Sequence, residues 1–369
     1  MTPLLVLIGG TFQEGLPRIE EAVCRKLSDS FEVTGVEYPR FKNLLHLLIG
    51  RYSLVERINH HLKIIHSFGL PSARQCLWLN RLNHGFNRLI LPRDIKNSLK
   101  QTILLTFTPE AVFLPEILGK AAKIIYFVVD DYPSLPAWKH PSSQRHFRYL
   151  EKQFLKKAGL VITSSWPLYE RYRKLHPKVV HFPTPIDFPS ENKIAGRIPE
   201  DLARLKPPYV GFAGGLYDWR TDPEFLISLL KAYPQYSFVF IGQAQTKLPL
   251  SNFHYLGYKK DHELDSYLAN FSAGLIPYKT DTYGRYAYPV KVNEYFRFGL
   301  PVVSTSLPAL KNQADRRLLY WSKTDREFIL NLKKAVTEEN PSLKSARIKE
   351  ALSQSWPAQK KYLIKLLKN

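Results

Sequence analysis

"YAYPVKVNEYFRFGLPVVST", residues 286–305, contains the most informative local pattern in this chain. Pro289 suits the first turn of a helix, and Gly299 suits the position just after a helix ends. The residues that follow, PVVST, are typical of a buried parallel strand because they are short, apolar and β-branched. A helix that leads into such a strand through a short Gly-Leu-Pro link predicts a layered α/β domain.

Two oppositely charged residues, Lys291 and Glu294, lie one turn apart on this predicted helix. Such a pair is commonly a solvated ion pair that stabilises the helix by about 0.2–0.5 kcal/mol. Because the helix follows a loop, the same two side chains could instead bind the charged and polar groups of a ligand. The pair alone does not distinguish an ion pair from a ligand site, so the surrounding sequence is needed.

Strands and helices alternate in two successive runs along the chain. The first run begins with PLLVLIGG, residues 3–10, and the second with YVGFAGG, residues 209–215; each is a predicted strand followed by a glycine turn. Between the two runs, prolines and polar residues accumulate in residues 179–208. At 369 residues the chain is also longer than one hydrophobic core usually grows.

This pattern predicts the α/β class, with two Rossmann-like domains that face a cleft. We assign residues 1–186 to an N-terminal domain and residues 187–345 to a C-terminal domain. Residues 346–369 form a predicted C-terminal helical segment, whose helix is expected to cross back to the N-terminal domain.

The chain is strongly basic, with 53 Lys and Arg against 32 Asp and Glu and a formal net charge of +21. Such an excess favours an anionic partner: a nucleic acid, an acidic membrane surface or a phosphorylated substrate. Residues 51–100 alone hold nine basic and two acidic residues. An apolar stripe in this segment predicts a basic amphipathic helix that contains Leu54, Val55, Ile58, Leu62 and Ile65. The basic face of this helix is either an ordinary solvated surface or a surface that lies on anionic lipid.

The cysteines and histidines do not have the spacing of a metal site. Cys24 and Cys76 lack CxxC spacing, so neither a metal site nor a disulfide framework is expected. His60, His61 and His66 have no third ligand at a usual distance in the sequence and are interpreted as part of a solvated helix face.

The N-terminal apolar run lacks the flanking features of a signal peptide, and no apolar run reaches the ~20 residues that a membrane span requires. We therefore expect a cytoplasmic protein, either free or peripheral on the inner face of the membrane.

Glycine turns after strands allow backbone N–H groups to approach a phosphate, and a helix start adds roughly half a positive charge there. Gly9-Gly10 and Gly214-Gly215 both qualify, and the second turn is the stronger candidate because Arg220 follows it. Neither turn completes GxGxxG, which argues against a nicotinamide cofactor.

A resemblance to a known family rests on two long segments and on the order of their motifs. The segments are YVGFAGGLYDWRTDPEFLISLLKAYPQYSFVFIG, residues 209–242, and residues 252–310, in which Pro-x-Lys-x-x-Glu-Tyr precedes Gly-x-Pro-Val-Val. VVDDYPS at 128–134 and AGLVITSS at 158–165 add to it. Together they resemble GT-B glycosyltransferases, in particular the teichuronic-acid-type bacterial enzymes.

The resemblance implies a hexosyltransferase that moves a sugar from a nucleotide-diphosphate sugar to a glycan or lipid-linked acceptor during cell-surface polysaccharide assembly. The N-terminal domain would bind the acceptor and the C-terminal domain the donor, without a metal or another cofactor. Glu294 matches the family glutamate that accepts hydrogen bonds from the ribose hydroxyls. Lys291 is the first choice for a cation that offsets the donor diphosphate, followed by Arg285 and Arg220. Gly214 and Gly215 complete the implied donor site.

An inverting reaction would need a general base, and Asp130 and Asp131 follow a predicted strand at a suitable edge. Asp at such a position is also a frequent turn or helix cap. Many retaining relatives have a second glutamate where this chain has Tyr286, and an arginine where it has Gly215, so retention and inversion both stay open.

Two other functions remain as alternatives. A nucleotide-sugar 2-epimerase has the same architecture and would act on the nucleotide sugar alone. A basic nucleic-acid-binding protein would also explain the charge of +21, but it would leave Glu294 without a role, so binding to nucleic acid is not expected.

Overall fold

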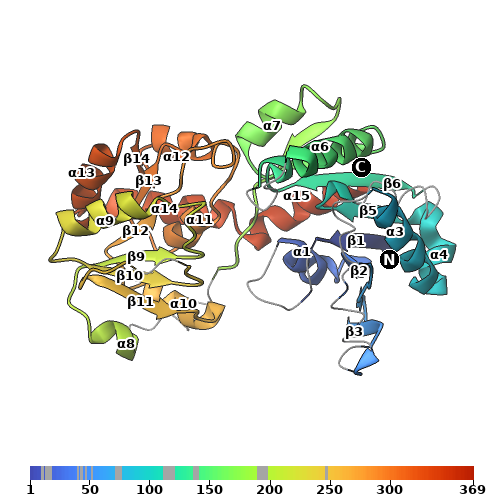
Figure 1. Ribbon diagram of the computed structural model, residues 1–369, viewed down its shortest axis with the longest axis horizontal. Coiled ribbons are helices and arrows are strands. Elements are labelled where there is room, and N and C mark those ends of the chain that lie inside the picture. The colour runs from blue at the N-terminus through green and yellow to red at the C-terminus, as the bar shows by residue number, and fades with distance from the viewer. Residues whose placement is uncertain are drawn as a thin grey trace. The chain divides into compact units, whose positions relative to one another are not determined.

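The computed structural model describes residues 1–9, 12, 19–39, 41, 45, 48–50, 53–70, 77–110, 121–135, 141–188, 198–245 and 248–369. Gly10, half of the first predicted glycine turn, and Cys76 lie outside these residues. The chain forms two compact units (Figure 1). Unit 1 contains residues 1–184 and 360–369, and unit 2 contains residues 185–359.

Unit 1 is built on a sheet with the strand order β3-β4-β2-β1-β5-β6-β7-β8. The neighbouring strands are parallel, except that β3 and β4 are antiparallel. The strands are β1 (Thr2–Ile8), β2 (Phe31–Glu37), β3 (Val55–Asn59), β4 (Leu62–Ile65), β5 (Ile103–Thr106), β6 (Lys123–Val128), β7 (Leu160–Thr163) and β8 (Val179–His181). β1 is an interior strand between β2 and β5, as in a doubly wound sheet.

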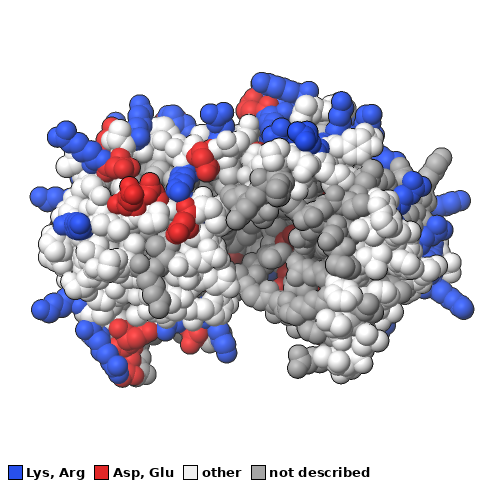
Figure 2. Space-filling model, viewed as in Figure 1, with Lys and Arg blue, Asp and Glu red and all other residues white. Residues whose placement is uncertain are grey.

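Helices pack beside this sheet (Figure 1). They are α1 (Ile19–Leu27), α3 (Leu77–Ile90), α4 (Arg93–Ser98), α6 (Pro141–Leu155), α7 (Trp166–Tyr172) and the last turns of α15 (Trp356–Lys368). Short 3-10 turns lie at Leu99–Gln101 and Tyr132–Ser134. The start of α7 shows how the sequence sets a helix boundary, because the Ser165 side chain accepts a hydrogen bond from Leu168 N. Figure 2 shows Lys and Arg side chains gathered over α6 and α7.

The amphipathic helix predicted within residues 51–65 is wrong, because residues 55–65 form the β3–β4 hairpin. In β3 the side chains alternate between exposed and half-buried, which is the period of a strand. β4 buries Leu62 and Ile64 and pairs in parallel with β2. The apolar spacing of one, three and four residues fitted a helix as well as a strand, and pairing with β2 decided the outcome.

Unit 2 is built on a parallel sheet with the strand order β11-β10-β9-β12-β13-β14. Its strands are β9 (Tyr209–Ala213), β10 (Ser237–Ile241), β11 (Phe253–Gly257), β12 (Ala273–Ile276), β13 (Val302–Thr305) and β14 (Tyr320–Ser322). Every residue of β9, β10 and β12 is buried, as expected for a parallel sheet covered on both faces.

The helices of unit 2 are α8 (Glu200–Ala203), α9 (Pro223–Ala232), α10 (Asp261–Leu268), α11 (Lys291–Phe296), α12 (Lys311–Asp315), α13 (Asp325–Val336), α14 (Pro341–Ser353) and the start of α15, with a 3-10 turn at Pro308–Leu310. Three of them begin at a side chain that caps the helix. Asp222 accepts from Glu224 N at the start of α9, Thr324 from Glu327 N at α13, and Asn340 from Leu343 N at α14.

Residues 286–305 adopt the predicted helix and strand. α11 begins at Lys291, and Gly299 follows it with a φ of 69°, a left-handed conformation that glycine tolerates best. The VVST run becomes β13 between β12 and β14.

The division between the units falls between Thr184 and Pro185, whereas the sequence placed it after residue 186. Residues 346–359 differ more from the prediction, since they belong to unit 2 rather than to a separate helical segment. The reason is burial: Arg347 and Ala351 of α14 are 1% and 0% exposed. Residues 360–369 belong to unit 1, where Lys123 Nζ donates to the Leu366 carbonyl at 2.9 Å.

Candidate active site

Lys291 reaches from the first turn of α11 to the glycine turn that follows β9. Its side chain is buried, with 9% of the residue exposed. A Cβ atom added at Gly214 would lie 2.3 Å from Lys291 Nζ, and Gly214 has a φ of 142°. Gly214 therefore provides both the backbone conformation and the space that bring a cation to the end of β9.

Tyr278 lies beside both Lys291 and Arg220. Lys291 Nζ is 5.0 Å and the Arg220 guanidinium carbon 4.4 Å from the centroid of the Tyr278 ring. Burial alone would raise the pKa of the Tyr278 phenol, but the Lys291 and Arg220 charges outweigh it, so the pKa lies below its ordinary value. Two buried or half-buried cations thus create a positive field at one end of the unit 2 sheet.

Arg220 is held in place by rings and by the backbone. Its guanidinium carbon lies 5.4 Å from the Trp219 ring and 5.8 Å from the Tyr283 ring. The Arg220 carbonyl accepts a hydrogen bond from Lys279 N at 2.8 Å. These contacts join the loop after β9 to the loop after β12, so the Arg220 position depends on both.

The glycine turn is also required by the packing of unit 2 itself. A Cβ at Gly242 would lie 2.3 Å from the Gly214 carbonyl oxygen, and a Cβ at Gly215 would meet the Tyr217 ring at 2.2 Å. Gly214 N donates to Ile241 O at 2.7 Å, which occupies one of the two predicted phosphate-binding amides. The phosphate-binding role of this turn stays a prediction.

The structure brings together three of the predicted donor-site positions, Gly214, Arg220 and Lys291. Glu294 is half-buried on the same helix as Lys291, and its charge acts on the Tyr278 phenol. Arg285 is exposed, and no described side-chain contact joins it to the other cations.

Tyr278 was not predicted from the sequence, although a signal existed. It comes two residues after β12, at the carboxyl end of a parallel strand, and ligand sites in such sheets form at those ends.

Asp131 of unit 1 is engaged on both carboxylate oxygens. Oδ1 accepts from Arg171 Nη1 at 2.6 Å, Oδ2 accepts from Ser134 Oγ at 2.6 Å, and the residue is 2% exposed. Arg171 Nη2 also lies 3.9 Å from Glu151 Oε2. These contacts favour a structural role for Asp131. Asp130, half-buried just after β6, is then the better of the two candidates for a general base.

Substitution of each aspartate by asparagine is expected to separate these two roles. Asp131→Asn should lower the free energy of unfolding by about 2 kcal/mol, because Arg171 loses its buried partner. Asp130→Asn should leave the urea midpoint unchanged and lower transfer turnover about 100-fold if the reaction uses this base. Full turnover in folded Asp130→Asn would rule out Asp130 as the base.

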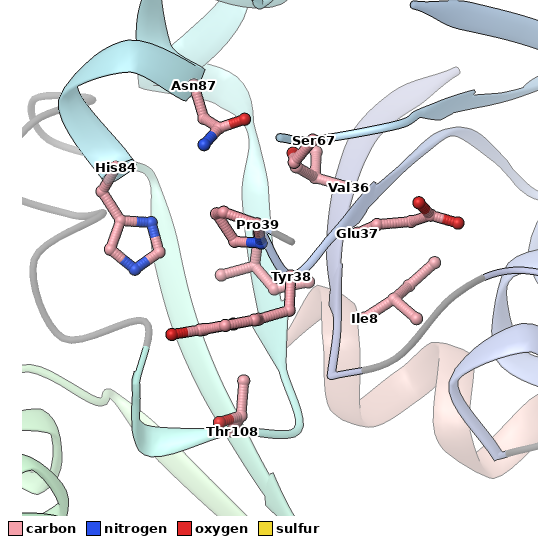
Figure 3. A pocket seen from close by; sticks show the side chains of 10 residues that line it. Ile8, Val36, Glu37, Tyr38, Pro39, Ser67, His84, Asn87 and Thr108 are labelled. Atoms are coloured by element: carbon pink, nitrogen blue, oxygen red, sulfur yellow. The ribbon is translucent and has the colours of Figure 1, made fainter. Parts of the chain in front are cut away.

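A small pocket in unit 1 lies where β1, β2 and β5 end and α3 packs nearby (Figure 3). It is lined by Leu7, Ile8, Val36, Glu37, Tyr38, Pro39, Ser67, His84, Asn87 and Thr108. The cavity volume is about 20 Å³, which is space for about one water-sized group. Its position at the carboxyl ends of parallel strands is where ligands of such sheets bind.

His84 and Asn87, which α3 extends toward this pocket in Figure 3, present hydrogen-bond acceptors. Burial lowers the pKa of His84 to about 4, so the ring is neutral, and its Nε2 lies 3.0 Å from the Glu110 carbonyl, which leaves Nδ1 as an acceptor. Asn87 Nδ2 donates to Asn83 O at 2.6 Å, while Asn87 Oδ1 has no hydrogen-bond partner among the described residues. Such a pocket suits a ligand that brings hydroxyl donors.

The prediction that His66 lies on a solvated helix face is wrong. His66 follows β4, is 3% exposed, and lies between two carboxylates, with Nδ1 3.1 Å from Glu37 Oε2 and Nε2 3.1 Å from Glu56 Oε2. Burial opposes protonation, but the two carboxylates raise the pKa of His66 above its ordinary value. Within the described part of the chain, no group of three or more His, Cys, Asp or Glu is placed to hold a metal ion.

Comparison with known proteins assigns unit 2 to a family. Residues 207–337 match the profile of the family described as Glycosyl transferases group 1. Unit 2 carries a group 1 glycosyltransferase domain. A putative teichuronic acid biosynthesis glycosyltransferase, TuaH of Bacillus subtilis (strain 168), is 25% identical over 158 residues. That alignment covers 40% of this chain and 40% of TuaH, so it spans less than half of the relative.

Solved structures extend the likeness from the glycosyltransferase domain to the whole chain at the level of the fold. The sucrose-phosphate synthase of Thermosynechococcus elongatus aligns over 100% of this chain and 98% of its own, with a TM-score of 0.74 and 12% identity. Anabaena HepE, solved in complex with UDP-glucose, aligns over 99% of both chains with a TM-score of 0.67 and 14% identity. The predicted GT-B fold is confirmed, and the family match supports the predicted transferase class.

Proposed function

We propose that this chain transfers a sugar from a nucleotide-diphosphate sugar to a glycan or lipid-linked acceptor in the assembly of a cell-surface polysaccharide. The observation that carries the proposal is the convergence of Lys291 and Arg220 on Tyr278 beside Gly214. Two relatives support it: HepE was solved with UDP-glucose, and TuaH is named as a putative teichuronic acid biosynthesis glycosyltransferase.

In this proposal the two cations act on the leaving group. As the bond between the donor sugar and the diphosphate breaks, negative charge grows on the phosphate oxygens, and fixed cations stabilise it without needing to reorient. Lys291 is preorganised by burial and Arg220 by its aromatic neighbours. The Gly215 amide and Arg285 would add further donors, and Glu294 would accept from the ribose hydroxyls. The two cations supply the charge that a metal would otherwise supply, so we propose a metal-independent reaction.

The acceptor would bind in unit 1. Asn87 Oδ1 and His84 Nδ1 offer acceptors to a sugar hydroxyl, and Asp130 would accept its proton on an inverting route. Among the described helices, none is both long and apolar enough to span a bilayer. We propose that the protein acts at the inner face of the membrane as a peripheral enzyme.

Glu294→Ala is expected to weaken nucleotide-sugar binding about 10- to 100-fold, since hydrogen bonds to a carboxylate contribute about 1.5–3 kcal/mol. Thermal shift with a panel of UDP- and GDP-sugars measures this, because a ligand at 100 times its dissociation constant stabilises the protein by about 2.7 kcal/mol. Glu339→Ala, an exposed acid of the same unit, is the control. If Glu294→Ala binds the donor as tightly as the unchanged chain, its ribose role is wrong.

The same panel separates transfer from epimerisation. The donor should persist when no acceptor is supplied, apart from slow hydrolysis, and be consumed once an acceptor is added. Conversion of the donor into its 2-epimer without an acceptor would overturn the transferase proposal in favour of the epimerase.

A further inference from the structure

Helix α3 exposes a stripe of large apolar side chains. Trp78 is 63% exposed, Leu82 44%, Phe86 47% and Leu89 73%. Their spacing of four, four and three residues places them on one face, within an arc of about 80° at 100° per residue. Single exposed apolar residues are normal on a protein surface, whereas a continuous helical stripe of four indicates an interaction site.

The opposite face of α3 is polar and buried. Asn80, Asn83, His84 and Asn87 are between 0% and 5% exposed. Asn80 Nδ2 donates to Glu110 O at 2.9 Å, and Asn83 Oδ1 accepts from Leu70 N at 2.8 Å. An amphipathic helix of a globular protein normally buries its apolar face. α3 does the reverse, so the folding of unit 1 does not account for its outer stripe.

The charge around this stripe is positive. Arg81 and Arg88 are exposed on α3 beside the apolar residues. Residues 57–96 contain seven Lys or Arg and one acidic residue, Asp94, which pairs with Lys63. An apolar stripe of Trp, Leu and Phe with flanking Arg is the combination found in helices that lie in the interface of anionic membranes.

We propose that the outer face of α3 docks on an anionic lipid bilayer, with Trp78, Leu82, Phe86 and Leu89 in the interface and Arg81 and Arg88 near the headgroups. This surface replaces the predicted helix at 51–65 as the membrane contact. A second copy of the chain is a poorer occupant, because it would bring the same arginines close to one another.

Docking through α3 also has a consequence for the acceptor, and this step rests on the proposed function. The same helix contributes His84 and Asn87 to the unit 1 pocket. A helix that lies on the bilayer with its outer face holds its inner face, and therefore this pocket, within one helix diameter of the lipid, about 10–12 Å. The acceptor would then be a lipid-linked saccharide rather than a free one.

Vesicle flotation of the full chain tests the docking surface. We expect binding to vesicles of phosphatidylcholine with phosphatidylglycerol, weaker binding to phosphatidylcholine alone, and a loss at high salt. The combined change Trp78→Gln, Leu82→Gln and Leu89→Gln should lower binding more than about tenfold, and Leu89→Gln alone should lower it in part. Leu330→Gln with Leu352→Gln, which are 54% and 48% exposed in unit 2, is the matched control and should bind normally.

Three outcomes would overturn the docking proposal: no vesicle binding by the unchanged chain, undiminished binding by folded triple and single variants, or a dimer in gel filtration that only the α3 variants dissociate. Thermal shift with nucleotide sugars keeps the two proposals separate. Donor binding without vesicle binding refutes docking alone. Vesicle binding without donor binding by any nucleotide sugar refutes the transferase and leaves docking intact.

Discussion

Lys291→Ala is expected to lower the turnover of sugar transfer about 100- to 1,000-fold, comparable to the loss of one preorganised donor from an oxyanion site. The ammonium is held over the Phe212 ring at 4.2 Å and beside Gly214, where no other described lysine or arginine reaches as closely. The effect should appear in kcat at saturating donor, because charge develops on the diphosphate mainly in the transition state. Initial rates with a radiolabelled donor measure it.

The control for this variant is Lys231→Ala, an exposed lysine of α9 in the same unit, which should retain full turnover. Lys291→Arg keeps the charge but has to fit a larger head beside Gly214, so it should recover only part of the rate. A thermal midpoint checks that the variants fold. Turnover of Lys291→Ala within twofold of the unchanged chain would show that the diphosphate is neutralised elsewhere, and Arg220 or Arg285 would be the next residue to replace.

The fold could be predicted to the extent that it depends on local pattern. Short, continuous apolar runs such as β9 and β10 are typical of the central strands of a parallel sheet, which are buried on both faces. The β3–β4 hairpin was not predicted because its apolar spacing fits both a helix and a strand. Pairing of β4 with β2, which lies far away in sequence, makes these residues strands. The helical pattern of residues 346–359 was predicted, but their place in unit 2 was not, since the burial of Arg347 depends on contacts with Leu318 and Glu338.

The candidate site shows the same limit. Lys291 and Glu294 could be proposed from the sequence because one helix turn relates them directly. Tyr278 and the cation pair could not, since their contacts require the loops after β9 and β12 to meet. His84 and Asn87 could not be predicted as site residues, because the sequence does not show that the polar face of their helix is the buried one.

Arg347→Met is expected to lower the free energy of unfolding of unit 2 by about 3–5 kcal/mol, the cost of breaking a buried ion pair from one side. Arg347 is 1% exposed, and its Nη1 and Nη2 donate to the two carboxylate oxygens of Glu338 at 2.5 and 2.8 Å. Its Nε also donates to Leu318 O at 2.7 Å. Methionine fills a similar volume but leaves Glu338 buried without its cation and the Leu318 carbonyl without its donor. Urea unfolding followed by tryptophan fluorescence measures the loss.

Two further variants isolate the cause of this destabilisation. Arg204→Met breaks the ion pair with Glu200, whose side chains are 73% and 85% exposed, and should change stability by less than about 1 kcal/mol. Adding Glu338→Leu to Arg347→Met removes the stranded carboxylate and should recover part of the stability, because an apolar pair often replaces a buried ion pair without loss. If the double variant is less stable than Arg347→Met, the cost lies in the lost backbone contacts of Arg347 and in packing. The Glu338 carboxylate without its cation, which still accepts from Tyr320 Oη at 2.9 Å, would then make a minor contribution.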